Sequence, residues 1–308
     1  MSFSRRIKDE ISQRERTETE SSALLSAFIR ANAKISKNKI EMTTENLMTS
    51  KKIHLLFDNL YQVKAKTTSN KNKVFNRSHL FEIVVDEKLD IILKDLSIWD
   101  EKKKQLKEIK DYLIGGEEEK RAYLAGSFLS SGSINDPKTS SYHMEIIVAD
   151  RFEAVLIQKL LNSYDLNSKI LKRDKKYMIY IKEAEKISDF LKIISVHQAV
   201  LYYENERTYR FQKNVVNRLN NCEQANVDRI IETANRQIAD INLIEEMIGL
   251  DALDEKTKET AIYRRKYPES SLAELSEIIS TETKETISKS GINHRLRRIR
   301  EIASKLKK

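Results

Sequence analysis

The stretch from 123 to 136, YLAGSFLSSGSIND, combines a helical pattern with many small side chains on one face. A related stretch, LLSAFIRANAKI, spans residues 24–35. Small residues let two helix backbones approach closely, so we expect the two helices to pack along each other. The small residues of the later helix are Ala125, Gly126, Ser127, Ser130 and Ser131. Those of the earlier helix are Ser22, Ala23, Ser26, Ala27 and Ala31.

The order of expected elements around these two stretches repeats. The first unit has helices over 17–31, 45–61 and 87–99 and strands over 39–44, 62–68 and 79–85, assigned from apolar periodicity. The second unit has helices over 118–131, 151–164 and 184–196 and strands over 142–150, 167–174 and 176–182. Two similar units of roughly 90 to 100 residues indicate an internal duplication.

Strand patterns stop after about residue 200. Residues 226–248 carry a helical apolar stripe, and the chain reads as helix from there to its end. The stripe consists of Val227, Ile230, Ile231, Ala234, Ile238, Ile241, Ile244 and Ile248. We therefore expect two repeats over 1–112 and 113–213, a linker over 214–225 and a helical domain over 226–308.

Composition limits the class of protein. In 308 residues, 40% are hydrophobic and 33% charged, with only 6 Gly and 2 Pro, as in a helix-rich protein without low-complexity segments. The chain shows neither a signal-peptide pattern nor an apolar run long enough for a membrane span. The single cysteine, Cys222, suits a reducing cytoplasm. The five histidines form no ligand spacing, so we expect neither a metal site nor a cofactor.

Most of the net charge of +9 lies at the end of the chain. Residues 288–308 carry eight Lys or Arg and one Glu, a net charge of +7. Such a segment favours an anionic partner such as double-stranded DNA. A solvated basic helix without a partner is the alternative.

The basic segment has the pattern of a helix-turn-helix over about 270–303. Pro268 breaks the chain, and Ser270 or Ser271 can cap a supporting helix with Glu274 in its first turn. A polar turn precedes a second helix, whose apolar stripe leaves polar residues on the other faces. Asn can pair with adenine and Arg with guanine, while caps and Lys meet phosphates. The candidate DNA contacts are Ser271, Ser288, Lys289, Ser290, Asn293, His294, Arg295, Arg297 and Arg298.

The Leu-Ala-Gly of residues 124–126 resembles the start of the LAGLIDADG motif of homing endonucleases. There, each of the two central helices supplies a carboxylate to a shared metal site. The corresponding position here is Ser131 in the second unit, and Ala31 or Asn32 in the first. Because Mg²⁺ needs anionic oxygen ligands, we expect no catalytic residues and no metal.

Three stretches together resemble the WhiA proteins of Gram-positive bacteria: 123–146, 214–226 and 271–299. The resemblance implies an α+β fold, a duplicated LAGLIDADG-type domain of order αββαββα with a pseudo-two-fold saddle, followed by an all-α helix-turn-helix domain. It also implies a catalytically dead, nucleoid-associated cytoplasmic protein that acts in cell division, chromosome segregation or transcription regulation.

Two alternatives remain open at this point. The protein could be a scaffold whose LAGLIDADG domain binds a protein partner, or a metal-dependent endonuclease. A basic stretch of the second unit could also bind DNA phosphates weakly and without regard to sequence. Its residues are Lys169, Lys172, Arg173, Lys175 and Lys176.

Overall fold

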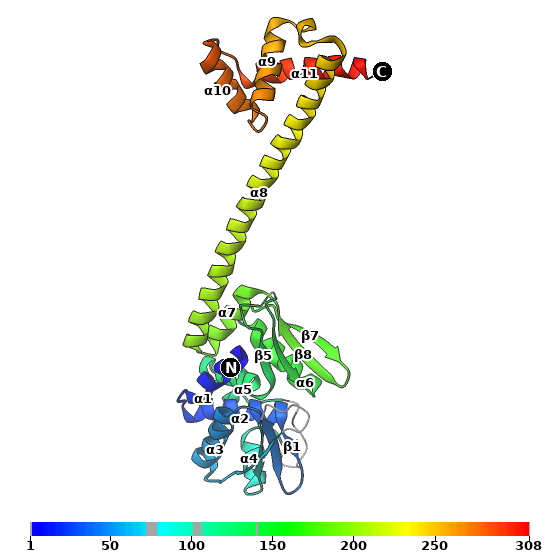
Figure 1. The fold of residues 1–308 in the computed structure, drawn as a ribbon. Helices are drawn as coiled ribbons and strands as arrows, with labels where there is room; N and C mark the ends of the chain where they lie inside the picture. The colour runs from blue at the N-terminus through cyan, green and yellow to red at the C-terminus, as the bar shows by residue number, and fades with distance from the viewer. Residues whose placement is uncertain (1, 72–78, 101–105, 107, 140, 308) are drawn as a thin grey trace. The chain divides into compact units, whose positions relative to one another are not determined.

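A computed structural model describes residues 2–71, 79–100, 106, 108–139 and 141–307 (Figure 1). The chain forms two compact units, residues 1–211 and 212–308. The first is α+β and the second is all-α. Each unit has its own hydrophobic core.

The first unit contains two repeats of the order αββαββα, which confirms the expected fold class. Helix α1 (Phe3–Gln13) precedes them. The first repeat consists of α2 (Glu18–Asn32), β1 (Lys34–Ile35), β2 (Ile40–Thr44), α3 (Leu47–Tyr61), β3 (Lys66–Lys71), β4 (His79–Val85) and α4 (Leu89–Asp95). After the short helix η1 (Asp111–Leu113), the second consists of α5 (Glu117–Ser131), β5 (Gly132–Ile134), β6 (Met144–Val148), α6 (Arg151–Asn162), β7 (Lys169–Arg173), β8 (Lys176–Ile181) and α7 (Ala184–Ile193).

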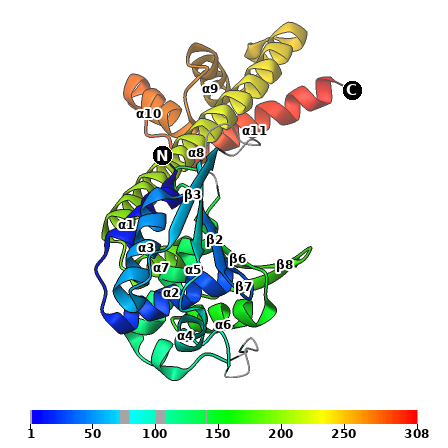
Figure 2. The same cartoon turned by 90° about the horizontal axis from the view of Figure 1, so that it is seen from below.

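Each repeat forms one antiparallel sheet of four strands. The orders, β1-β2-β4-β3 and β5-β6-β8-β7, are equivalent. Helix α3 packs on β2 and β4, as α6 packs on β6, β7 and β8. Figures 1 and 2 place α2 and α5 side by side at the centre of the unit, where the two repeats meet.

The contact between α2 and α5 brings two backbones together. A Cβ atom built on Gly126 would lie 2.2 Å from the carbonyl oxygen of Leu24 and 3.0 Å from its Cα. The surrounding side chains, including Ala27, Ala125 and Phe128, are fully or almost fully buried. The small residues therefore serve helix packing, as the sequence pattern indicates.

Helix α1 was not predicted from the sequence. Phe3, Ile7 and Ile11 are buried at a spacing of four residues, although the segment between them is mostly charged. The hydroxyl of Ser4 donates to the carbonyl of Ile134 at 2.9 Å and accepts from the amide of Ile134 at 2.8 Å. Helix α1 thus closes the end of β5 in the second repeat.

Several expected boundaries were wrong for local reasons. The strand expected over 62–68 begins at Lys66, because Gln62 ends α3 in a left-handed conformation (φ 53°). The helix expected over 87–99 ends at Asp95, and Ser97 has φ 56°. Strands β1 and β5 are too short to leave an alternating pattern. Part of the charged stretch 100–111 lies outside the described residues.

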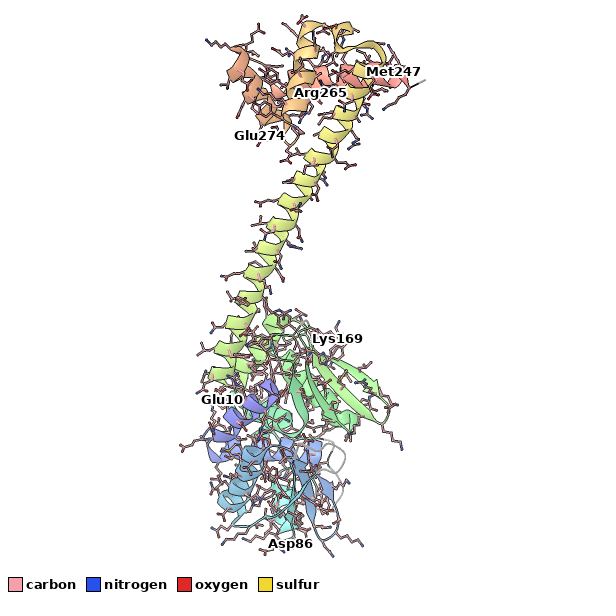
Figure 3. The ribbon with its side chains drawn as sticks, in the orientation of Figure 1. Glu10, Asp86, Lys169, Met247, Arg265 and Glu274 are labelled. Atoms are coloured by element: carbon pink, nitrogen blue, oxygen red, sulfur yellow. The ribbon has the colours of Figure 1, made fainter. Side chains whose placement is uncertain are left out.

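The second unit contains α8 (His197–Ile248) from residue 212 onward, η2 (Leu250–Ala252), α9 (Glu255–Lys266), α10 (Leu272–Thr283) and α11 (Lys289–Leu306). The first turn of α8 belongs to the first unit, where the Glu10 carboxylate accepts from the amides of Gln198 and Ala199 (Figure 3). Residues 214–225, predicted as a linker, are helical. Among the described residues, no helix combines the length and apolar character needed to cross a membrane.

We predict that Gly126→Ala destabilises the protein by roughly 1 to 3 kcal/mol, because the added methyl group must push α2 and α5 apart. In an open helix the same change would stabilise by about 1 kcal/mol. Urea unfolding of the first unit measures the difference. Ser130→Ala, on a half-buried position of the same helix, is the control and should change little. A stabilised Gly126→Ala variant would show that the backbones do not touch.

We also predict a pH dependence from Glu153, whose carboxyl is 2% exposed and accepts from the Tyr123 hydroxyl at 2.6 Å. Burial raises the pKa of Glu153 from 4.5 to about 7, although the Tyr123 hydrogen bond and Arg30 lower that pKa. Between these values the folded state binds more protons than the unfolded state. Stability therefore falls as the pH rises through this window, by on the order of 3 kcal/mol.

The measurement is the free energy of unfolding from pH 5 to pH 8 for the wild type and for Glu153→Gln. The glutamine resembles the protonated acid, so this variant should lose that slope and be the more stable protein at pH 8. Parallel curves for the two proteins would contradict the assignment.

Candidate nucleic-acid interface

Four helices of the second unit form one small core. Its buried side chains come from the end of α8, from α9 and Leu253 just before it, and from one face each of α10 and α11. They are Ile241, Ile244, Leu253, Ala261, Leu275, Ile279, Ile292, Leu296, Ile299 and Ala303. Within the apolar stripe of 226–248, Ala234, Ile241 and Ile244 are buried, whereas Val227, Ile231 and Ile248 are 48%, 39% and 47% exposed.

Helix α10 begins with a capping box, as predicted. The N-cap is Ser271: its hydroxyl accepts from the Glu274 amide, and the Glu274 carboxylate accepts from the Ser271 amide. These bonds fix the start of the helix and lower the pKa of Glu274. Ser271 therefore has a structural role at the entrance to the helix-turn-helix.

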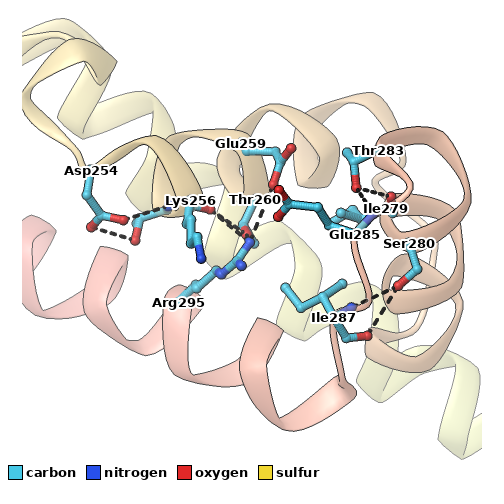
Figure 4. A network of polar contacts seen from close by, with 11 residues as sticks. Asp254, Lys256, Glu259, Thr260, Ile279, Ser280, Thr283, Glu285, Ile287 and Arg295 are labelled. Carbon is cyan, nitrogen blue, oxygen red and sulfur yellow. Dashed lines mark hydrogen bonds and ion pairs between the residues drawn. The ribbon is translucent and has the colours of Figure 1, made fainter.

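Hydroxyl groups of α10 hold the turn that leads into α11 (Figure 4). Ser276 donates to the carbonyl of Ile287 at 2.7 Å, and Ser280 accepts from the amide of Ile287 at 3.0 Å. Thr283 accepts from the amide of Glu285 at 3.3 Å. The turn therefore follows from side chains of the helix before it, and it sets where α11 begins.

Helix α11 presents a polar face to solvent. Its N-cap is Ser288, whose hydroxyl accepts from the Gly291 amide at 3.2 Å, so this serine acts as a cap. One face carries the buried Ile292, Leu296 and Ile299. The candidate residues of the opposite face are exposed: Ser290, Asn293, His294 and Arg297. The exposed face thus offers amide, imidazole and guanidinium groups within two helical turns.

Arg295, one of the expected DNA contacts, is bound to the neighbouring helix α9 in this structure. Its side chain is 17% exposed, and its Nη1 donates to the carbonyl of Lys256 and to the hydroxyl of Thr260, both at 3.1 Å (Figure 4). The carboxylate of Glu259 lies 3.5 Å away. Arg295 thus braces α11 against α9, because the helical period turns this position towards the neighbouring helix.

Arg298 is both paired within the unit and accessible to solvent. It forms an ion pair with Asp254 at 2.9 Å, but its side chain remains 58% exposed. Asp254 caps α9 by accepting from Thr257, and the Thr257 hydrogen bonds and the charge of Arg298 lower the pKa of Asp254. Arg298 therefore links the two helices at the surface and keeps part of its guanidinium accessible.

A hollow of about 500 Å³ runs between α8 and α11. Asn293, Arg297 and Arg300 line it from α11, and Arg236 lines it from α8. Arg236 and Arg300 were not among the predicted contacts, since their shared location follows only from how the helices pack. The basic surface of the unit is consequently wider than the exposed face of α11.

The sheet registers show which residue of the first repeat corresponds to Ser131 of the second. Lys34 pairs with Glu41 as Ser133 pairs with Glu145 in the second sheet. The central helices end two residues before these strand positions, so Asn32 is the counterpart of Ser131. Asn32 donates to the Ser130 carbonyl at 3.4 Å and accepts from the Thr43 amide at 2.9 Å. The described residues contain no cluster of His, Cys, Asp or Glu suited to a metal ion.

The five basic residues around β7 do not share one face. Side chains alternate along a strand, and Ile170 packs against the core, so Lys172 lies on that side. Lys169 and Arg173 lie on the opposite, outer face, where Lys176 pairs with Arg173. All five side chains are exposed, Lys175 in the turn included (Figure 3 labels Lys169).

Acidic side chains occupy the same outer faces. Glu41 and Glu145 alternate with buried residues of β2 and β6, and Glu82 does so on β4. Lys39 pairs with Glu41 at 2.7 Å, and His143 lies 3.1 Å from Glu145. The outer faces of the sheets therefore carry mixed charge.

Comparisons with known proteins cover the described frame from end to end. Residues 18–99 match the WhiA N-terminal LAGLIDADG-like domain, 120–213 the WhiA LAGLIDADG-like domain and 216–303 the WhiA C-terminal HTH domain. A "Probable cell division protein WhiA" from Brevibacillus brevis is 37% identical, and one from Bacillus cereus strain G9842 is 42% identical. Each alignment covers 100% of this chain and 98% of the relative.

Solved structures show the same fold. The crystal structure of full-length DUF199/WhiA from Thermatoga maritima has a TM-score of 0.61 at 25% identity and covers 99% of both chains. The N-terminal LAGLIDADG domain of DUF199/WhiA has a TM-score of 0.53 at 20% identity, over 63% of this chain and 91% of that one.

We predict that Arg295→Ala destabilises the contact of α9 with α11 by roughly 1 to 2 kcal/mol, because it removes charge-assisted hydrogen bonds from a mostly buried position. Arg297→Ala, two residues further along on the exposed face of α11, should stay within about 0.5 kcal/mol of the wild type. Hydrogen exchange of the α9 and α11 amides in the full-length protein distinguishes the two. Equal protection in both variants would exclude the bracing role.

Proposed function

Because the chain belongs to the WhiA family, we propose that it is a DNA-binding protein that acts in cell division through its C-terminal helix-turn-helix. The observation that carries the proposal is the exposed face of α11. Ser290, Asn293, His294 and Arg297 face solvent from a helix whose apolar side is fixed in a core. A helix held in this way can enter the major groove and read base edges.

Three groups of residues have different roles in this proposal. Asn293 and Arg297 read bases, the former suited to adenine and the latter to guanine. Lys289 and Arg298 neutralise phosphates. Ser271 and Ser288 cap the helices, and Arg295 positions α11.

The relatives, which are named probable cell division proteins, support a proposal for the role in the cell. We propose that this chain also acts in cell division, on the nucleoid in the cytoplasm. Chromosome segregation, transcription regulation or both would be the route, because each requires binding at chosen chromosomal sites. The first unit has no catalytic role in this proposal, since Asn32 and Ser131 replace the two carboxylates of the LAGLIDADG frame.

A scaffold function of the first unit is the second candidate. The mixed charge of its sheet faces, with Glu41, Glu82 and Glu145 beside Lys169 and Arg173, favours a protein surface over the DNA backbone as a partner. Any contribution of this unit to DNA binding would be through phosphates, and hence weak and insensitive to sequence.

We predict that Asn293→Ala and Arg297→Ala each weaken binding to a cognate duplex by roughly 1 to 3 kcal/mol, with little effect on a scrambled duplex. Cognate sites come from genome-wide mapping of the bound protein, and fluorescence anisotropy measures the affinities at several salt concentrations. Lys94→Ala, on an exposed position of α4 in the first unit, is the charge-matched control for Arg297→Ala.

Unchanged discrimination between the two duplexes in both variants would refute reading by α11. A variant that combines Asn293→Ala and Arg297→Ala could lose site preference in vitro and still keep its chromosomal positions in cells. In that case a protein partner of the first unit would be directing the protein to those positions. That outcome would favour the scaffold.

A further inference from the structure

A second hollow of the helical unit lies at the N-terminus of α10. It measures about 310 Å³ and is enclosed by α8, by the turn between α9 and α10, and by the start of α11. Three cationic side chains line it, Arg229, Arg264 and Lys289, together with Ser271, Leu272 and Ala273. No carboxylate is among the described residues that line it.

Arg264 is the unusual member of this group. It is 2% exposed and one of the largest fully buried side chains in the described part of the chain. Its Nη1 donates to the carbonyls of Ser270 at 2.7 Å and Tyr267 at 3.4 Å, but its Nε has no hydrogen-bond partner. Burial lowers the pKa of Arg264. No ion pair of Arg264 is found among the described residues, so a buried positive charge lacks compensation.

The start of α10 adds further donors. The first amides of a helix have no acceptors within the helix, and the helix dipole favours an anion there. Ser271 and Glu274 satisfy each other in the capping box. The amides of Leu272 and Ala273 have no acceptor among the described residues, and both residues line the hollow.

The two remaining cations complete the site. Arg229 on α8 and Lys289 on α11 are exposed, and neither forms an ion pair with a described residue. They come from two different helices, which line the hollow together with the start of α10. Cations from three helices thus surround free amide donors, which is the arrangement that binds a phosphate group.

We propose that this hollow binds a phosphate group, supplied by the DNA backbone when the protein sits on a duplex. The proposal rests on DNA binding by the helical unit, and it assigns to α8 a direct contact with the ligand through Arg229. The contact carries no sequence information, because a phosphate is the same at every base pair. It would fix the register of α11 in the groove.

The test uses the full-length protein with Arg229→Ala, Lys289→Ala and the double variant. Arg264 is left intact, because its guanidinium holds the turn at 267–270. Lys213→Ala, on an exposed position of α8 that does not line the hollow, is the matched control. Affinities for cognate and scrambled duplexes are measured over a range of salt concentrations, and melting temperatures with and without pyrophosphate.

For a DNA phosphate, each single variant should weaken binding to both duplexes by about 3-fold and reduce the slope of log affinity against log salt by about 1. The control should leave the slope unchanged. For a free anion, DNA binding would be unaffected, and pyrophosphate would raise the melting temperature of the wild type but not of the double variant. This result would also support a phosphate site, in which a soluble ligand rather than DNA supplies the phosphate group.

Unchanged slopes together with no effect of pyrophosphate would overturn the proposal. That failure is distinguishable from failure of base reading by α11, because base reading is measured by the difference in affinity between the cognate and the scrambled duplex. The site described here affects both duplexes equally.

Discussion

The first unit depends on the approach of two helix backbones at Gly126 and Leu24. Two helices can meet at this distance only where one residue lacks a Cβ atom, so a single glycine sets the separation of α2 and α5. Each helix leads directly into the first strand of its own sheet. The positions of both sheets therefore follow from that contact, and so does the meeting of Asn32 with Ser130 at the helix ends.

The same geometry explains how the LAGLIDADG-like frame can form with Asn32 and Ser131 at the ends of its central helices. Placing two helix ends side by side is a requirement of packing, whatever the residues at those ends. Asn32 satisfies the neighbouring backbone with its amide, which donates to Ser130 and accepts from Thr43. A pair of carboxylates in this place would repel each other unless a cation lay between them. Neutral side chains remove the need for that cation and leave the packing intact.

Sequence patterns predicted the elements that depend on local information. Alternation located β4 at residues 79–85, and a serine cap at 270 or 271 followed by Glu274 located the start of α10 to within one residue. Patterns failed where a partner distant in sequence decides the outcome. Helix α1 forms because α3, α5 and β5 pack against it and bury Phe3, Ile7 and Ile11. Strand β1 exists because its two residues pair with β2. The hydrogen bonds of Arg295 to α9 could not be predicted for the same reason, since no local pattern says which helix will lie beside α11.

The distribution of charge in the helical unit also depends on packing. Arg295, Arg298 and Lys307 each face a carboxylate of another helix, Glu259, Asp254 and Asp240 respectively. These pairs neutralise part of the +7 carried by residues 288–308, and they lock α11 against its neighbours.

Arg297 and Lys289 have no such pair among the described residues, and Arg229 joins them from a different helix. Net charge alone therefore overstates the number of cations available to a ligand. An anionic partner can bind only the smaller set of cations that the fold leaves unpaired. A recognition helix needs both kinds of cation, because the paired ones hold it in place and the unpaired ones bind the ligand.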